Sequence, residues 1–121
     1  MALAAFHVYA MAIEAVARVD LGEVHTATLV ATTALATVEN LQGCEYGLEI
    51  RALCADALAR AGSPQADEAR RRAIAYANAL AGAIRDPRLR KLFSNRVASE
   101  APLAAPPEPS AADVARPVEA Q

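Results

Sequence analysis

The chain has 121 residues, of which 55% are hydrophobic, yet only 4% are aromatic and Trp is absent. Alanine accounts for the difference, because 32 residues are Ala while large aliphatic and aromatic side chains are comparatively few. A chain of this length forms one domain. Ala favours helices and disfavours strands, so the composition excludes an all-β fold or a parallel sheet and predicts an all-α domain.

The net charge of −2 conceals a segregation of charge along the sequence. Residues 1–61 carry a net charge of −4, residues 62–97 carry +5 and residues 98–121 carry −3. Such segregation can steer a charged partner toward one part of the molecule, but it does not decide which partner that is.

Cysteine spacing and the N-terminal sequence favour a cytoplasmic protein. Cys44 and Cys54 match neither a redox motif nor a zinc motif, so we expect two reduced thiols. The apolar run over residues 2–13 has no preceding Lys or Arg, which a secretory signal requires. Glu14 ends this run before it is long enough to span a bilayer, so we expect no membrane association.

Gly and Pro divide residues 1–97 into five predicted helices that form one helical domain. The predicted helices cover residues 3–20, 23–42, 45–61, 64–85 and 87–97. The first two form a hairpin over 3–42, the next two form a hairpin over 45–85, and the last is a capping helix. Ser63–Pro64 and Asp86–Pro87 are typical helix starts, in which a polar cap precedes a Pro at the first helical position.

Apolar residues recur at helical spacing in each predicted helix. In the first helix Phe6, Ala10, Ile13, either Val16 or Ala17, and Leu21 recur in this way and predict its apolar face. The apolar stripes predicted for the next three helices are Val24, Ala27, Ala31, Ala34, Val38 and Leu41, then Tyr46, Ile50, Leu53, Ala57 and Ala61, and then Ala66, Ala69, Ala73, Tyr76 or Ala77, Leu80 and Ile84.

Residues 98–121 differ abruptly in composition from the rest. They contain five of the seven Pro residues and no large apolar residue beyond Leu103 and two Val. Such a segment cannot bury enough surface to offset the entropy of ordering it, so the sequence predicts a disordered Ala/Pro-rich tail.

The two hairpins form an internal repeat. Residues 13–22 align without gaps on residues 53–62, which gives a period of about 40 residues. Small residues recur in register in the two units, namely Ala15, Ala27, Ala34, Ala55, Ala66 and Ala73. We expect these residues to lie where two helices approach closely.

This pattern resembles the tetratricopeptide repeat (TPR) family. Gly22, Ala27 and Ala34 stand at the family's spacing of its turn glycine and the small residues of its second helix. The sequence departs from the family in two respects. Its repeat is longer than the family's period of about 34 residues. Arg18 and Leu58 also stand where the family usually has an aromatic residue. These departures favour the looser TPR-like arrays that end many bacterial signalling and regulatory proteins.

The resemblance implies a non-enzymatic protein–protein interaction module or scaffold at the C-terminal end of a longer array. First helices of TPR-like hairpins line the concave side, where a protein or peptide partner binds. The residues that the resemblance places there are Tyr9, Ala12, Val16, Asp20, Glu49, Ala52, Asp56 and Arg60. Positions 49, 52, 56 and 60 share one largely polar helix face, which suits a peptide groove or ordinary exposed surface equally well. Alternatively, the chain is not the end of a longer array but a fragment that self-associates through its apolar first helix.

Motifs for catalysis and metal binding are absent from the sequence. His7 and His25 stand on different helices without a second ligand at metal-binding spacing. Glu45 and Glu49 have no histidine partner nearby, and phosphate-binding loops and serine-nucleophile motifs do not occur. We therefore expect no enzyme activity, no cofactor and no metal.

An alternative prediction is a small helical regulator that binds nucleic acid or an acidic partner through its basic C-terminal third. The residues of that surface would be Arg85, Arg88, Arg90, Lys91 and Arg96. The isoelectric point near 5.6 and the single interleaved aromatic residue, Phe93, disfavour nucleic acid. Solvated helix faces and complementation of helix dipoles explain most of these charges.

Overall fold

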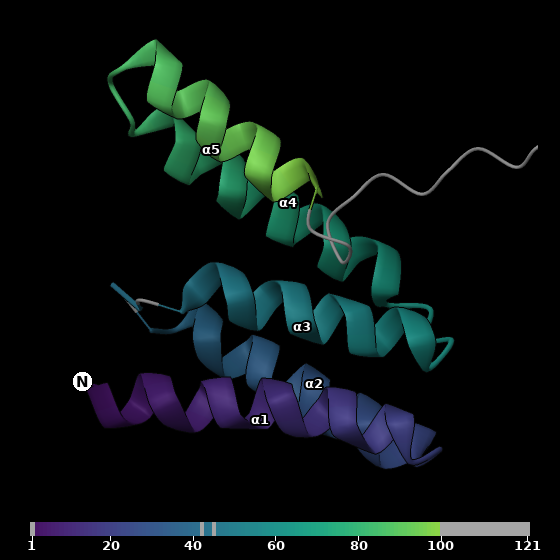
Figure 1. Cartoon of the computed structure of the whole chain (residues 1–121). Helices are drawn as coiled ribbons and strands as arrows, with labels where there is room; N and C mark the ends of the chain where they lie inside the picture. Colours follow the sequence, from purple (N-terminus) through teal and green to yellow (C-terminus); the bar gives the residue numbers. More distant parts are fainter. Residues whose placement is uncertain (1, 42, 45, 100–121) are drawn as a thin grey trace, which may run out of the picture.

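The computed structural model describes residues 2–41, 43, 44 and 46–99, which form five helices and no strand. The helices are α1 (Ala2–Asp20), α2 (Val24–Glu39), α3 (Gly47–Arg60), α4 (Ala66–Gly82) and α5 (Pro87–Ser99) (Figure 1). The predicted all-α class is confirmed. α5 continues two residues past its predicted end, and the rest of the predicted tail, residues 100–121, lies outside the described residues.

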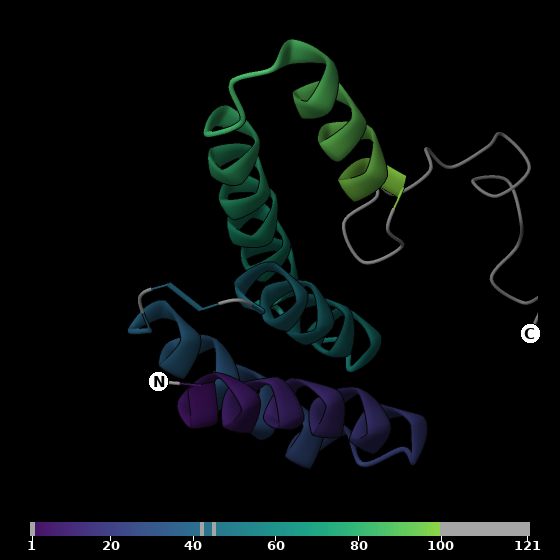
Figure 2. The ribbon, with the colours of Figure 1, turned by 60° about the vertical axis from the view of Figure 1, so that its left-hand side comes forward.

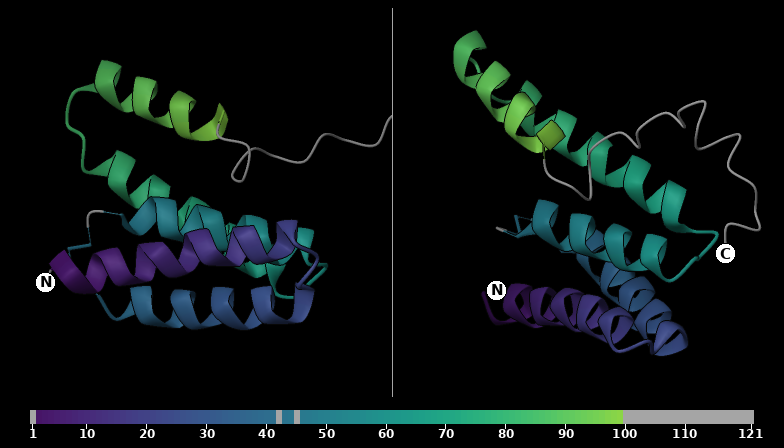
Figure 3. Two further views of the ribbon diagram at one scale, coloured as in Figure 1. Left: turned by 60° about the horizontal axis from the view of Figure 1, so that its bottom comes forward. Right: turned by 45° about the vertical axis from the view of Figure 1, so that its right-hand side comes forward.

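The first hairpin, the second hairpin and α5 follow one another in space. α1 and α2 form one hairpin, α3 packs against both of these helices, and α4 packs against α3 (Figure 1). Among the described helices α5 packs against α4 alone, and it turns away from the first hairpin (Figure 2). The two views of Figure 3 show α3 beside the first hairpin, and α4 and α5 beyond α3. α3 is therefore the helix that joins the two hairpins.

The two hairpin turns are built identically, 40 residues apart. At the first turn the N–H of Gly22 donates to the carbonyl of Val19 and the N–H of Glu23 donates to the carbonyl of Arg18. At the second turn Gly62 and Ser63 repeat both bonds to Ala59 and Leu58. Both glycines have positive φ, 79° and 72°, as this helix-ending motif requires. The predicted glycine turns are confirmed.

The predicted helix starts differ in how soon the α-helix begins. Asp86 caps α5, because its Oδ1 accepts a hydrogen bond from the N–H of Arg88 at 2.9 Å. Ser63 instead caps a preliminary turn, in which its hydroxyl accepts from the N–H of Gln65 and its carbonyl accepts from the N–H of Ala66. α4 therefore begins at Ala66 rather than at Pro64.

Alanine dominates the core. The fully buried side chains with the largest volume are only Ile50, Leu58, Val8, Val38 and Cys54. The small residues predicted at helix contacts are fully or almost fully buried except Ala66, which is half-buried; the buried ones are Ala15, Ala27, Ala34, Ala55 and Ala73. Small side chains thus let neighbouring helices pack closely, as the repeat predicts.

The predicted apolar face of the first helix does not face the core. Phe6 is 53% exposed and Leu21 is 71% exposed, while α1 packs into the core through Val8, Ala12 and Ala15. α1 is apolar around most of its circumference, so periodicity alone selects the stripe with the largest side chains. The core accepts the opposite side, because small residues there allow α2 to approach.

Candidate partner-binding surface

α1 and α3 lie side by side and run in the same direction (Figure 1). An aromatic cluster joins them near the start of both helices. The ring of Tyr9 stacks on Tyr46 with centroids 4.8 Å apart and planes 5° apart, and Phe6 meets Tyr46 at 5.4 Å in a tilted arrangement. Aromatic pairs of this geometry add directional stabilisation to the burial of their rings. This cluster fixes the first hairpin against the start of α3.

An ion-pair cluster joins the other ends of the same two helices. Arg60 on α3 pairs with Asp20 on α1, and its Nη1 lies 3.5 Å from the Oδ2 of Asp56. The hydrogen bond with Asp20, with a smaller contribution from Asp56, raises the pKa of Arg60 above its ordinary value. The cluster is exposed, so it orients the three charges more than it stabilises the fold.

The structure brings together most of the residues predicted for the partner-binding side. Asp20, Glu49 and Arg60 are exposed, and the half-buried members are Tyr9, Val16, Ala52 and Asp56. Ala12 is fully buried, so its assignment to this side is wrong. Ala12 belongs to the core-facing side of α1. We call the remaining seven residues the first-helix face.

Sequence reasoning missed Phe6 and Tyr46 as neighbours of this face. Both are aromatic and they occupy positions 40 residues apart, the period of the internal repeat. Extending the repeat alignment toward the N-terminus would therefore have paired them.

A groove of about 350 Å³ lies between α2, α3 and α4, away from the predicted side. Its lining residues are Thr32, Leu35, Ala36, Glu39, Arg51, Leu58, Gln65, Glu68, Ala69 and Arg72. Arg72 ties the two hairpins together here, because its Nη1 lies 2.8 Å from Glu39 on α2 and its Nε lies 2.9 Å from Glu68 on its own helix. Hydrogen bonds from Arg71 and Arg72 hold the pKa of Glu68 below its usual range.

The sequence did not predict a side-chain contact that joins α3 to α4. The guanidinium carbon of Arg51 lies 4.0 Å from the ring centroid of Tyr76, which is a cation–π contact. The same guanidinium donates a hydrogen bond of 3.0 Å to the carbonyl of Gly47. Gly47 is buried beneath the hydroxyl end of Tyr76, so the missing side chain lets α4 approach the start of α3.

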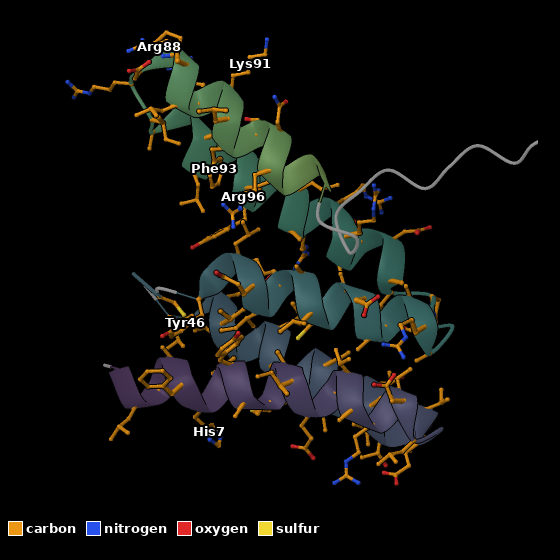
Figure 4. The ribbon with its side chains drawn as sticks, in the orientation of Figure 1. His7, Tyr46, Arg88, Lys91, Phe93 and Arg96 are labelled. Carbon is orange, nitrogen blue, oxygen red and sulfur yellow. The ribbon has the colours of Figure 1, made fainter. Side chains whose placement is uncertain are left out.

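The alternative basic surface is exposed, but part of it serves the helix ends. Arg88 pairs with Asp86 at 3.3 Å, and Arg90 donates two hydrogen bonds, of 2.9 and 2.7 Å, to the carbonyl of Ile84 just beyond the end of α4. Arg88 and Lys91 point outward from α5, away from the other helices (Figure 4). These contacts agree with the expected role of basic residues at helix ends.

The potential metal ligands and nucleophiles lie apart. His7 and His25 are exposed on different helices, and the described part of the chain holds no group of three His, Cys, Asp or Glu residues placed to bind a metal. Both cysteines are free thiols. Cys54 is buried, and desolvation of its thiolate raises its pKa to about 12.

None of the described helices combines the length and apolar character needed to cross a bilayer.

No protein-family model, curated protein or solved structure matches this chain. The resemblance to the TPR family therefore depends on the internal repeat and on the residues quoted for it.

Proposed function

We propose that the chain is a non-enzymatic protein–protein interaction module of the TPR-like helical repeat type. In this proposal it works in the cytoplasm and forms the C-terminal end of a larger bacterial signalling or regulatory array. The observation that carries the proposal is the first-helix face, which two successive first helices build together. Its seven residues come from both hairpins and are exposed or half-buried.

Helix packing supports the interpretation of the two hairpins as stacked repeats. α3 contacts both helices of the preceding hairpin as well as its own second helix, which is the connectivity that stacked hairpins require. The same turn hydrogen bonds recur 40 residues apart, and five of the six small residues aligned by the repeat are buried.

The chemistry of the face suggests the kind of partner. Asp20, Glu49 and Asp56 outweigh Arg60, so the face is net acidic, and Tyr9 adds an aromatic edge at one end. We expect a protein segment that presents basic and apolar side chains, because opposite charge favours encounter and an aromatic edge favours apolar contact.

Affinity capture with matched variants tests the proposal. The bait is the full chain, and the test variant Glu49→Lys/Ala52→Arg reverses the charge of the face and adds bulk to it. The control Lys91→Glu changes an exposed charge on α5. A partner that binds the wild type and the control but loses at least tenfold affinity for the test variant supports the proposal.

The reverse pattern would contradict it. If binding is lost with Lys91→Glu and kept with Glu49→Lys/Ala52→Arg, the basic surface of α5 carries recognition. A titration against duplex DNA at two salt concentrations then identifies nucleic acid, since a phosphate-driven complex weakens steeply with salt.

A further inference from the structure

Within the described residues, α1 carries a second apolar face that is largely uncovered, although Phe6 meets the ring of Tyr46 at one edge of it. Its members are exposed and recur every three or four residues; they are Leu3, Phe6, Ala10, Ile13, Ala17 and Leu21. At 100° per residue they occupy about a quarter of the helix circumference, so they form one continuous stripe. His7, on the flank of this α1 stripe, points away from the other helices (Figure 4). An exposed apolar surface of this continuity marks an interaction site.

The internal repeat shows what kind of contact this stripe makes. Forty residues later, Phe6, Ala10, Ile13 and Ala17 correspond to residues that pack α3 against the first hairpin. The corresponding residues are Tyr46, Ile50, Leu53 and Ala57. In α3 these positions are fully buried or packed against the core. The equivalent positions in α1 are exposed, so the stripe is a helix-packing surface whose partner is not among the described residues.

The opposite end of the molecule does not offer the complementary surface. α1 meets α3 through Tyr9 and Asp20, and the residues 40 positions later are Glu49 and Arg60. A head-to-tail stack of copies would have to bury these charges beneath an apolar stripe, which is unfavourable. A closed pair that buries the same stripe from each copy avoids this penalty.

The residues of the stripe suit an antiparallel pair. With Ala10 at the two-fold axis, Phe6 lies opposite Ile13 of the second copy, and Leu3 lies opposite its Ala17, so large side chains meet smaller ones. A parallel pair would instead align Glu14, on the flank of the stripe, with the Glu14 of the second copy, and like charges repel. The self-complementary arrangement is therefore the antiparallel one.

We propose that the α1 stripe is the interface of a two-fold symmetric dimer in which α1 packs antiparallel to the α1 of a second copy. The stripe is separate from the first-helix face, so a dimer leaves that face accessible. A preceding hairpin of a longer array would cover the same stripe, so the dimer replaces the array part of the proposed function. Recognition at the first-helix face is independent of which of the two covers the stripe, and its tests and those of the dimer can fail separately.

Sedimentation equilibrium of the full chain tests the dimer. Ile13→Glu places a charge in the stripe, and Leu92→Glu places the same charge on α5 at a residue of similar exposure, 65% against 50%. Both residues are exposed in the monomer, so circular dichroism should show unchanged helix content. We expect a dimer for the wild type and for Leu92→Glu, and at least a tenfold weaker dimer for Ile13→Glu.

The proposal would be overturned if the wild-type chain stays monomeric at about 100 μM. It would also be overturned if Ile13→Glu and Leu92→Glu weaken the dimer equally, or if the wild-type chain forms a series of growing oligomers instead of a dimer. A strictly monomeric chain would assign the stripe to a preceding hairpin of a longer array.

Cysteine cross-linking tests the orientation. In a Cys44→Ser background, Ala10→Cys places a thiol at the two-fold axis, whereas Ala17→Cys places it about 20 Å from its symmetry mate in an antiparallel pair. The native Cys54 is buried and does not compete. We expect a disulfide-linked dimer with Ala10→Cys alone. Equal cross-linking at both positions would indicate a parallel pair, and cross-linking at neither would exclude the interface.

Discussion

Gly47 lies at the first turn of α3, where the end of the Tyr76 side chain closes over it. A Cβ atom at this position would lie 2.9 Å from the Cζ of Tyr76 and closer still to its hydroxyl oxygen. Because real Cβ contacts are longer, any side chain must displace Tyr76, and Tyr76 in turn holds Arg51. One missing methyl group thus permits a three-residue contact between the hairpin's two helices.

Gly47→Ala should therefore destabilise the protein, although Ala is the better helix former. We expect a loss of about 1 kcal/mol, at the lower end of overpacking costs because Tyr76 is only half-buried. The matched control is Gly82→Ala in α4, where an added Cβ would meet nothing within 4 Å. This substitution should raise the free energy of unfolding by up to about 1 kcal/mol. Urea denaturation measures both. Equal shifts in the two midpoints would contradict the packing role of Gly47.

The two cysteines should differ sharply in reactivity. Burial raises the pKa of Cys54 to about 12, so at pH 8 fewer than about one in a thousand of its side chains is the reactive thiolate. Cys44 is only half-buried. With a disulfide reagent at pH 8 we expect one rapidly reacting thiol in the native protein and two in denaturant. The rapid phase should disappear in Cys44→Ser, and a native protein with two rapid thiols would argue against the burial of Cys54.

At the scale of the helices, local signals predicted the structure well. Gly22 and Gly62 end helices because the turn needs positive φ, and Asp86 begins α5 because its carboxylate reaches a free N–H. Each of these signals acts over a few residues, so the sequence displays it directly. Hydroxyls in the Thr-rich α2 bond to carbonyls one turn back, as Thr28 does to Val24, so the helix accommodates residues of lower propensity.

Which face a helix buries was less predictable. α1 has two apolar faces, and only contact with α2 and α3 selects the one that contains Ala12 and Ala15. The same limit applies to the candidate site: the repeat located the first-helix face but could not show that Ala12 is buried. The bridge from Arg72 to Glu39 and the groove beside it arise from residues 33 positions apart, for which no local pattern exists.

The cap of α5 should depend on pH through Asp86. Hydrogen bonds from the side chain and backbone of Arg88 hold the pKa of Asp86 below its usual value. The charged cap therefore stabilises the folded state fully above the unfolded-state pKa of about 3.9, and this contribution is lost as the pH falls through the lower folded-state pKa.

Hydrogen exchange of the amides of α5 measures this effect. At neutral pH, Asp86→Ala should reduce their protection, and Asp86→Asn should keep most of it because Asn is also a good cap. After exchange rates are corrected for their intrinsic pH dependence, the extra protection of the wild type over Asp86→Ala should shrink progressively as the pH falls below about 4. A difference that persists unchanged below this pH would show that the carboxylate charge contributes nothing.

On the scale of the whole molecule, α3 carries the connection between the hairpins. It packs against α1, α2 and α4, and its Ile50 and Leu58 are among the largest fully buried side chains. In a core built mainly of Ala, these few large residues account for a disproportionate share of the buried apolar area.

Ile50→Ala should consequently cost about 2–4 kcal/mol, the range for large-to-small changes at buried sites. Ile13→Ala, on the exposed stripe of α1, should cost about 0.5 kcal/mol or less in the monomer. The comparison requires chemical denaturation at low protein concentration, where the proposed dimer dissociates. Similar costs for the two substitutions would mean that α3 does not organise the core as described.

The alanine core also determines how stability varies with temperature. Each buried methyl group exposes little apolar surface on unfolding, and the heat-capacity change of unfolding is set largely by the apolar surface exposed. A protein whose interior is filled mainly by methyl groups should have a small heat-capacity change for its length. Its stability curve should then be broad and shallow, so warming or cooling by a few tens of degrees changes the folded population gradually.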